Sequence, residues 1–255
     1  MINIKYHYFN MNNAKKSIII IPARIGSTRL KNKPLLDIDG KPMILHVWER
    51  AIKAKSDMVI VATDSEDILQ IIKSNGGEAV LTSPNHKSGS DRVYEALQKI
   101  ENTHHQYDYI INLQGDLPNI NTKIINIGLK EISKTSADIL TYCSCIDNKE
   151  EIENKNIVKV AIGQNRGELN GIYFSRSPIP HGAEIFYEHV GIYIYKRNAL
   201  SKFISSKPTK LEITEKLEQL RALENNLKIN LILIDDKIIS IDTIDDLNRL
   251  KNYSK

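Results

Sequence analysis

The sequence predicts an α/β protein with a doubly wound, mostly parallel sheet. Short runs of branched apolar residues alternate with longer segments in which apolar residues recur at helical spacing. The chain has 255 residues, of which 41% are hydrophobic and 26% charged, and these values suit a single soluble domain. We therefore expect a Rossmann-like sheet with a smaller mixed β/α excursion.

The first strand lies at the start of segment 17–36, where four isoleucines, Ile18 to Ile21, form a continuous apolar run. Four apolar residues also fit a core helix, but Pro22, Gly26 and Lys33-Pro34 follow, and these are unsuited to a helix interior. We therefore expect a buried strand that ends in a loop. In open parallel sheets, ligands bind beyond the carboxyl ends of the strands.

That loop is rich in cations, with Arg24, Arg29, Lys31 and Lys33 around Gly26. Glycine lets the backbone approach a ligand closely, and a guanidinium can bind two phosphate oxygens at once. Solvated basic loops are common, and the spacing matches neither the P-loop nor the dinucleotide-binding fingerprint. The residues alone therefore predict an anion site, with phosphate the favoured anion.

The next elements continue the alternation. We expect a strand at 35–38 before an Asp39-Gly40 turn, helices at 42–55 and 65–74, strands at 57–63 and 79–81, a loop at 82–89, a helix from Ser90 or Asp91, a strand at 109–113, a helix at 122–134 and a strand at 138–146.

The pattern changes after residue 146. We expect a hairpin of strands 157–162 and 169–174, a strand at 190–195, an amphipathic helix at 211–223, strands at 227–234 and 237–241, and a last helix at 242–251 capped by Thr243. Residues 17–255 are interpreted as one domain in which 147–225 form a lobe for the second substrate and a dimer contact. Residues 1–16 are polar and asparagine-rich, and we interpret them as a disordered tail, with Met11 as an alternative natural start.

Bulk properties exclude several classes of protein. The net charge of +4 is spread along the chain, whereas nucleic-acid binders usually show a denser basic stripe. No segment approaches the roughly 20 apolar residues of a membrane span. Cys143 and Cys145 have no partners for a metal or redox motif, so we expect both to be core-strand residues of a cytoplasmic protein.

The segment ARIGSTRLKNKPL resembles the signature of the sugar-nucleotide cytidylyltransferases, a branch of the wider nucleotidyltransferase family. The resemblance continues through DIDGKPMILHVWERA, VATDSEDI, HKSGSDRV and INLQGDLP, and it runs from about Ile18 to the C-terminus. It is closest to the members that activate the sugar acid 3-deoxy-manno-octulosonate (Kdo) with CTP for lipopolysaccharide biosynthesis. The resemblance implies a nucleotidyltransferase fold, Mg²⁺ as cofactor, CTP and Kdo as substrates, and a homodimer.

Two acidic residues, Asp116 and Asp242, each follow an expected strand. Each alone would more often be a turn or helix-cap aspartate. Strand ends meet at one edge of such a sheet, however, and two carboxylates there can hold Mg²⁺. The resemblance favours this role, because QGD and IDTIDD match the two metal-binding places of the family. Leu117 stands where the family commonly has an acidic residue, so no ligand is expected there.

The remaining roles come from the resemblance. It implies that Arg24, Arg29 and Lys33 contact the triphosphate and, with Asp116 and Asp242, form the catalytic set; no role is assigned to Lys31. Nucleotide binding also includes Gly26, Ser27, Ser88 and Gly89. The residues that match the sugar-acid site are Arg92, Gln114, Arg176, His189, Tyr193, Glu215 and Gln219.

Three of the sugar-site assignments have simpler alternatives. Glu215 and Gln219 are four residues apart, which would place them on one face of a helix, where such pairs are ordinarily surface residues. His189 alone would more often be a hydrogen-bonded structural residue than a base. Arg92 and Arg176 suit the carboxylate of a sugar acid.

Three rival functions remain at this point. The chain could act on a related sugar acid such as a nonulosonic acid. It could be a non-catalytic nucleotide-binding relative, although binding alone would not require both aspartates. A nucleic-acid-binding protein is favoured only by the isoelectric point of about 8.8.

Overall fold

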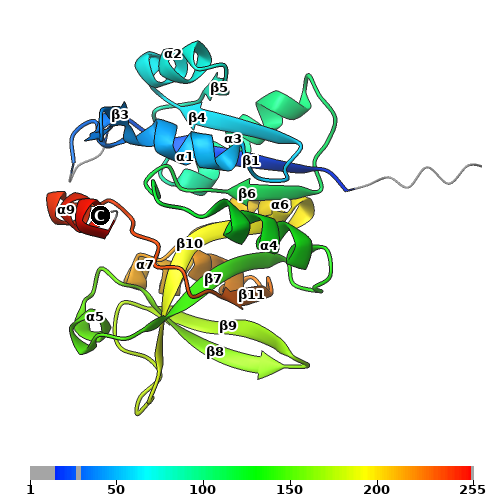
Figure 1. Ribbon diagram of the computed structural model, residues 1–255. Helices are drawn as coiled ribbons and strands as arrows, with labels where there is room; N and C mark the ends of the chain where they lie inside the picture. The colour runs from blue at the N-terminus through cyan, green and yellow to red at the C-terminus, as the bar shows by residue number, and fades with distance from the viewer. Residues whose placement is uncertain (1–14, 27–29, 254–255) are drawn as a thin grey trace, which may run out of the picture.

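The structure is a computed structural model that describes residues 15–26 and 30–253. Residues 1–14 of the tail expected at 1–16 and the candidate site residues Ser27 and Arg29 lie outside these ranges. Within them, a nine-stranded sheet has the strand order β5-β4-β1-β6-β10-β7-β11-β9-β8 (Figure 1). Its strands are β1 (Ser17–Ala23), β4 (Met58–Thr63), β5 (Glu78–Leu81), β6 (Tyr109–Asn112), β7 (Ile139–Ile146), β8 (Lys159–Asn165), β9 (Glu168–Ser175), β10 (Phe186–Lys196) and β11 (Ile229–Leu233).

The upper half of the sheet is parallel, because β1 pairs in parallel with both β4 and β6, and β4 with β5. Strand β10 then enters antiparallel between β6 and β7, and β11 pairs in parallel with β7. The β8–β9 hairpin forms the far edge. The expected α/β fold is confirmed, and within the nine-stranded sheet the antiparallel pairs all involve strands β8, β9 or β10.

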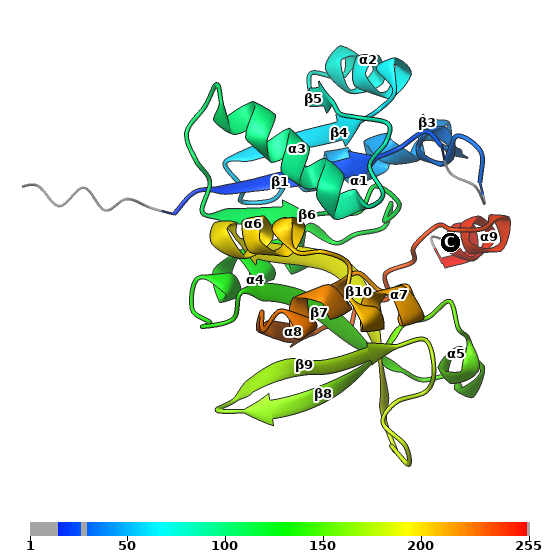
Figure 2. The ribbon, with the colours of Figure 1, turned by 180° about the vertical axis from the view of Figure 1, so that it is seen from behind.

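Helices cover both faces of the sheet. On one face lie α1 (Met43–Ala51), α2 (Glu66–Ser74) and α4 (Thr122–Ile132), and on the other lie α3 (Gly89–Glu101), α6 (Arg197–Ser205) and α8 (Gln219–Glu224) (Figure 2). Successive residues of a strand point to opposite faces. Ile19 and Ile21 therefore pack in the core on the face of α1, α2 and α4, and Ile18 and Ile20 pack in the core on the face of α3, α6 and α8. This explains the continuous apolar run that predicted the strand.

A smaller third core lies beside the edge of the sheet. It contains Ile38 of the hairpin formed by β2 (Asp37–Ile38) and β3 (Lys41–Pro42), Met43 at the start of α1, Ile241 from the segment after β11, and Leu250 of α9 (Ile244–Tyr253). The expected strand at 35–38 is thus shorter, because residues Lys33–Leu35 form a 3-10 turn, η1. Figure 1 shows α9 next to this hairpin, so the last helix packs against residues that follow β1 in the sequence.

The helix expected from Ser90 or Asp91 begins earlier. Helix α3 starts at Gly89, and the Ser88 hydroxyl accepts a hydrogen bond from the backbone N–H of Asp91 at 3.1 Å. The predicted start was therefore wrong by one to two residues, since a serine that satisfies a free helix N–H is a favourable cap. The start at Ser88 brings the end of the helix to the edge of the sheet.

The helix expected at 211–223 is broken into α7 (Lys210–Glu215) and α8. Lys216 adopts the left-handed conformation, with φ of 56°, and ends α7. The break turns Leu217 into the core and lets the Arg221 guanidinium donate to the Glu212 carboxylate at 2.8 Å. The expectation that Glu215 and Gln219 share one helical face was therefore wrong.

Two further expectations fail in the second half. Segment 237–241 is not a strand but crosses the edge of the sheet, where the Ile241 N–H donates to the carbonyl of Asp116 at 3.0 Å. Cys143 is buried as expected, but Cys145 is exposed, so it is not a core residue. Among the described residues, no helix is both long and apolar enough to cross a membrane.

Candidate active site

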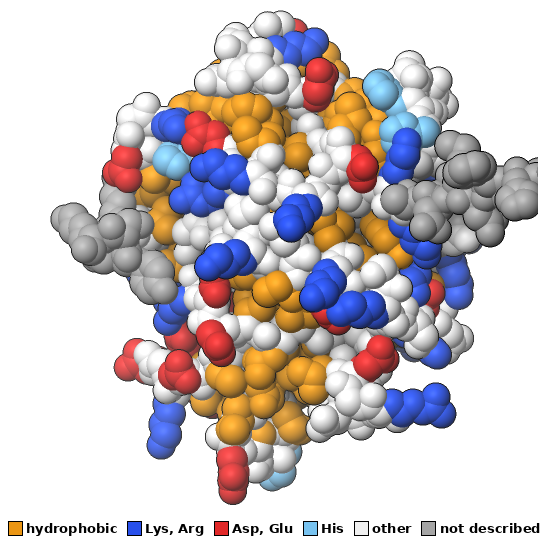
Figure 3. All heavy atoms as spheres, turned by 45° about the vertical axis from the view of Figure 1, so that its right-hand side comes forward, with side chains coloured by type: hydrophobic (Ala, Val, Ile, Leu, Met, Phe, Trp, Pro, Cys, Tyr) orange, Lys and Arg blue, Asp and Glu red, His pale blue; other side chains and the backbone are white. Residues whose placement is uncertain are grey.

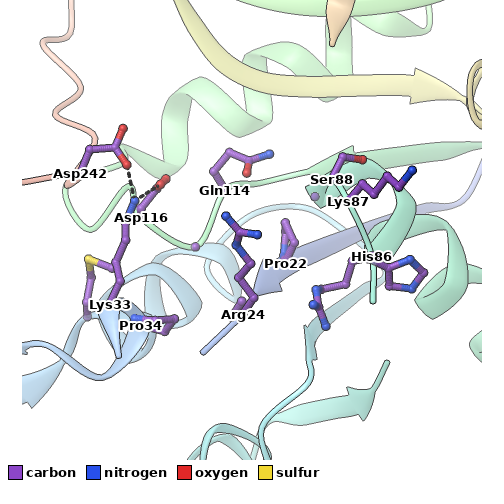
Figure 4. A pocket seen from close by; sticks show the side chains of 15 residues that line it. Pro22, Arg24, Lys33, Pro34, His86, Lys87, Ser88, Gln114, Asp116 and Asp242 are labelled. Carbon is purple, nitrogen blue, oxygen red and sulfur yellow. Dashed lines mark hydrogen bonds and ion pairs between the residues drawn. The ribbon is translucent and has the colours of Figure 1, made fainter. Parts of the chain in front are cut away.

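A cavity of about 280 Å³ opens beyond the carboxyl ends of β1 and β6. Eight residues that the sequence predicted for the site line it together, although they come from four separate segments (Figure 4). The lining residues are Pro22, Ala23, Arg24, Lys33, Pro34, Met43, His86, Lys87, Ser88, Gly89, Arg92, Gln114, Gly115, Asp116 and Asp242. Gly26 is exposed on the loop and does not line the cavity.

Asp116 and Asp242 meet at one end of the cavity, with Lys33 between them. The Lys33 ammonium donates to Oδ2 of Asp116 at 2.6 Å and to Oδ1 of Asp242 at 2.7 Å. Burial by itself lowers the pKa of Lys33, but the charges and hydrogen bonds of the two carboxylates outweigh it and raise the pKa above the ordinary value. The predicted convergence of the two aspartates is confirmed.

The chemistry of this pair fits a magnesium ion. The two carboxylates supply hard oxygen donors that already lie around one small cation, the ammonium of Lys33. Residues 15–26 and 30–253 contain no cluster of three or more His, Cys, Asp or Glu that could hold a metal. Mg²⁺ commonly takes one or two protein carboxylates and completes its shell with phosphate oxygens and water. The pair therefore suits a metal that arrives with a phosphorylated ligand.

The other end of the cavity is formed by the N-terminus of α3. Ser88 and Gly89 lie there, and free N–H groups at a helix N-terminus favour anions. The exposed Arg24 side chain extends into the space between this end and Asp116 (Figure 4). The cavity thus presents a cation and helix N–H groups on one side, and two carboxylates on the other.

Gly115 explains how Asp116 reaches the cavity. A Cβ atom at Gly115 would lie 2.8 Å from the carbonyl oxygen of Pro22, which is closer than real Cβ contacts allow. The loop after β6 can therefore pass against the end of β1 only because position 115 has no side chain. The sequence did not single out this glycine, although QGD follows a buried strand.

Arg92, which was predicted for the sugar-acid site, lines the cavity and contacts two protein side chains. Its guanidinium is buried and donates to Oδ2 of Asp64 at 2.9 Å and to Oγ1 of Thr82 at 2.5 Å. Oδ1 of Asp64 in turn accepts from the backbone N–H of Ile25 at 3.0 Å. Arg92 thus ties together the ends of three strands and the loop that contains Arg24. Asp64 was missed, although it follows a buried strand as Asp116 does.

Glu95 stabilises the loop before α3. The Glu95 carboxylate accepts from the backbone N–H of Ser83 at 2.9 Å, from Lys99 at 2.7 Å and from the ring of His86, which lines the cavity. Burial by itself raises the pKa of Glu95, but these donors outweigh it and lower the pKa to about 2. Glu95 therefore holds the wall of the cavity in place as a carboxylate. The sequence analysis missed both His86 and Glu95.

Three of the predicted sugar-site residues form a separate cluster on β10 and α8. The two ring nitrogens of His189 contact the Thr141 hydroxyl at 3.0 Å and the Gln219 amide at 3.5 Å, and its ring centroid lies 5.5 Å from that of Tyr193. Burial lowers the pKa of His189 to about 3. The ring is therefore neutral near pH 7, and one of its nitrogens can donate a hydrogen bond while the other accepts one.

The remaining two, Arg176 and Glu215, contact each other. The Arg176 backbone N–H donates to the Glu215 carboxylate at 3.1 Å, and its Nε donates to the Glu215 carbonyl at 3.0 Å. The Ser175 hydroxyl also donates to the Glu215 carboxylate, at 2.7 Å. These contacts join the end of β9 to α7, so Glu215 stabilises this junction.

A chain of hydrogen bonds joins the cavity to the lobe. Gln114 donates to Asn112 at 2.8 Å, Asn112 donates to Ser90 at 3.3 Å, and Ser90 donates to Oε2 of Glu218 at 3.0 Å. Burial raises the pKa of Glu218, and its Oε1 is a buried atom without a hydrogen-bond partner. Glu218 is thus a buried polar group still able to accept a hydrogen bond, next to Gln219, which was predicted for the sugar-acid site. Glu218 was not predicted from the sequence, because it resembles any other charge on a helix.

The comparisons with known proteins agree with this geometry. The sequence matches the cytidylyltransferase family over residues 18–229. It is 47% identical over 241 residues to the 3-deoxy-manno-octulosonate cytidylyltransferase of Bartonella quintana, covering 93% of this chain and 98% of that protein. It is 43% identical over 240 residues to the protein of the same name from Paramagnetospirillum magneticum, covering 93% and 97%.

Solved structures give the same result. A CMP:2-keto-3-deoxy-manno-octonic acid synthetase in complex with CTP superposes with a TM-score of 0.86 at 36% identity, covering 94% of this chain and 98% of that one. A glucose-1-phosphate thymidylyltransferase from Bacillus anthracis, described as putative, has a TM-score of 0.66 at 18% identity over 94% and 95%, which shows the fold alone. The chain therefore belongs to the cytidylyltransferase family, in the branch of the 3-deoxy-manno-octulosonate cytidylyltransferases.

Proposed function

We propose that this chain transfers a cytidylyl group from CTP to Kdo, and that Asp116, Asp242, Lys33 and Arg24 bind the reacting phosphates with a magnesium ion. The observation that supports the residue roles is the meeting of the two carboxylates at one end of a cavity that Lys33 and Arg24 also line. The family relationship supports the choice of CTP and Kdo.

The reaction is a substitution at phosphorus. The hydroxyl oxygen on the anomeric carbon of Kdo forms a bond to the α-phosphorus of CTP, the bond from that phosphorus to the bridging oxygen breaks, and pyrophosphate leaves with the electron pair. The hydroxyl proton passes to solvent. This chemistry depends on alignment and neutralisation of charge, and it needs no covalent intermediate with the protein.

The chain's own residues would supply that alignment. Arg24 and Lys33 neutralise charge on the triphosphate, and the N-terminus of α3 offers N–H groups to the nucleotide. Asp116 and Asp242 would hold Mg²⁺, which polarises phosphoryl oxygens and lowers the pKa of a bound hydroxyl. Arg29 lies outside the described residues, and its predicted contact with the triphosphate stays a prediction.

The sugar acid would bind where the lobe meets the cavity. The neutral His189, with Tyr193, Gln219 and the buried Glu218, offers hydrogen-bonding groups suited to the hydroxyls of a sugar. The chain of hydrogen bonds from Gln114 to Glu218 connects this region to the nucleotide pocket. Arg176 is the remaining cation proposed for the substrate carboxylate, since Arg92 is already bound to Asp64.

We propose that the protein is a homodimer through the lobe at 147–225. Among the described residues, no helix lies in front of β8 and β9 in Figure 1, and Ile172 of β9 is 61% exposed. Hydrophobic side chains also gather at the lower end of the face in Figure 3, where this hairpin lies. On the same face, Lys and Arg lie among acidic and uncharged side chains, which argues against a nucleic-acid surface.

Product analysis tests the function directly. The protein is incubated with CTP, Mg²⁺ and Kdo, and CMP-Kdo and pyrophosphate are measured together. A panel of other nucleotides and a nonulosonic acid serves as the comparison. Formation of CMP-Kdo that stops on addition of EDTA is the expected result. Preference for another sugar acid, or product formation that persists in EDTA, would contradict the substrate or the metal assignment respectively.

A further inference from the structure

Lys33 occupies the place that the proposed metal needs. Its ammonium contacts one oxygen of Asp116 and one of Asp242, and its side chain is 13% exposed. Magnesium binds carboxylate oxygens at about 2.0–2.1 Å, so it would use the same oxygens and the same space. A second cation could not sit beside the ammonium without strong charge repulsion.

The backbone holds Lys33 in this position, whereas its side chain can move. Asn32 adopts the left-handed conformation with φ of 54°, the Leu35 N–H donates to the Asn32 carbonyl at 2.8 Å, and Pro34 is buried. The lysine stem is flexible, and its ammonium is a compact charge that can reach more than one partner. Lys33 and Arg24 line the same cavity, so phosphates that bind Arg24 would lie within the surroundings of the Lys33 side chain.

The ammonium also lies between two partly exposed carboxylates, so these do not face each other alone. Like charges in one site repel, and the ammonium of Lys33 offsets that repulsion in the nucleotide-free protein.

We propose that Lys33 is a cation placeholder, which occupies the metal position in the free protein and moves to the phosphates when the nucleotide binds. This inference rests on the proposed function, since it takes Asp116 and Asp242 as the metal ligands. It follows that metal binds weakly without nucleotide. Nucleotide then raises the affinity for metal, and by thermodynamic reciprocity metal raises the affinity for nucleotide by the same factor.

Binding of Mn²⁺ alone tests the proposal without any measurement of activity. Free Mn²⁺ is measured by electron paramagnetic resonance during titration of the wild type, Lys33→Met and Lys33→Arg, with Lys31→Met as the matched control on an exposed residue of the same loop. Lys33→Met is expected to bind Mn²⁺ at least tenfold more tightly than the wild type. Lys33→Arg keeps a cation between the carboxylates, so it and Lys31→Met are expected to bind as weakly as the wild type.

Two further measurements complete the test. Adding Asp116→Asn to Lys33→Met should abolish the gain in Mn²⁺ affinity, and Mn²⁺ should raise the melting temperature of Lys33→Met more than that of the wild type. Equal Mn²⁺ affinity of Lys33→Met and the wild type would overturn the proposal that Lys33 occupies the metal position. Mn²⁺ binding that persists in the double variant would also overturn it, because the metal would then lie elsewhere. Failure of the proposed function is recognised separately, by CMP-Kdo formation in EDTA.

Discussion

Asp116 and Asp242 share the ammonium of Lys33, with contacts of 2.6 Å and 2.7 Å, although they lie in different halves of the chain. The backbone places them together, since the Ile241 N–H donates to the Asp116 carbonyl. The pair therefore belongs to a rigid edge of the fold, and its consequences can be tested residue by residue.

Replacing either aspartate by asparagine removes a charged ligand but keeps the shape of the side chain. For Asp116→Asn and Asp242→Asn we expect the rate of pyrophosphate release to fall by about 100-fold or more, a loss typical of electrostatic catalytic groups. The melting temperature should change little in comparison. The control is Asp147→Asn, an exposed carboxylate in the loop after β7. A near-wild-type rate in either variant would remove that residue from the site.

Replacing Arg92 separates a structural role from a substrate-binding role. Arg92→Met leaves the carboxylate of Asp64 buried without its partner, so we expect a loss of about 3–5 kcal/mol in the free energy of unfolding, measured in urea. The loop that contains Arg24 should also loosen, which raises KM for CTP. The sequence-based role would instead be correct if stability were retained and only KM for the sugar acid rose.

The low pKa of Glu95 predicts a dependence of stability on pH. The folded pKa of about 2 lies below the ordinary value of 4.5, so the carboxylate stabilises the fold fully above about pH 4.5, and this contribution is lost as the pH falls toward 2. Glu95→Gln should therefore be less stable than the wild type at pH 7, and the difference should shrink toward pH 2. Glu131→Gln, in an exposed pair with Lys134, is the control. A difference that does not change with pH would contradict the prediction.

His189 predicts a second pH effect with the same direction. Its folded pKa of about 3 lies below the ordinary 6.5, so the unfolded chain takes up a proton first and stability falls as the pH drops from 6.5 toward 3. His189→Asn should show a flatter stability curve over this range. It should also raise KM for Kdo more than KM for CTP. The exposed His104, changed to asparagine, should alter neither quantity.

The proposed dimer predicts a change in mass. Ile172→Asp would place a charge on the apolar surface of β9, and we expect the mass from light scattering to fall from that of two chains to that of one. Ile52→Asp, at a position 48% exposed after α1, is the matched control and should leave the mass unchanged. A wild-type protein with the mass of one chain at all concentrations would contradict the dimer.

Local patterns were sufficient to predict much of the fold. The apolar run at 18–21 predicted β1, Ser65 predicted the cap of α2, and the turn at 165–167 predicted the β8–β9 hairpin. Strand ends in a parallel sheet meet at one edge, and this rule alone placed Asp116 near other site residues. The cytidylyltransferase resemblance added the choice among the many acidic residues of the chain.

The failures share one physical cause. The break at Lys216 is accompanied by the contact of Arg221 with Glu212, and segment 237–241 is accompanied by its contact with the loop after β6. Arg92 looks like any cation at a helix start until Asp64 and Thr82 are placed beside it. Such contacts depend on partners distant in the sequence, so the conformational propensities of neighbouring residues do not predict them.

The sequence by itself thus determined the α/β class and the basic loop after β1, because hydrophobic periodicity and turn residues act over short distances, and the family resemblance singled out Asp116 and Asp242. Only the tertiary structure decided what each charged side chain contacts. Lys33 lies between two carboxylates and Arg92 is bound to Asp64, because a buried charge must find its partner wherever packing brings one.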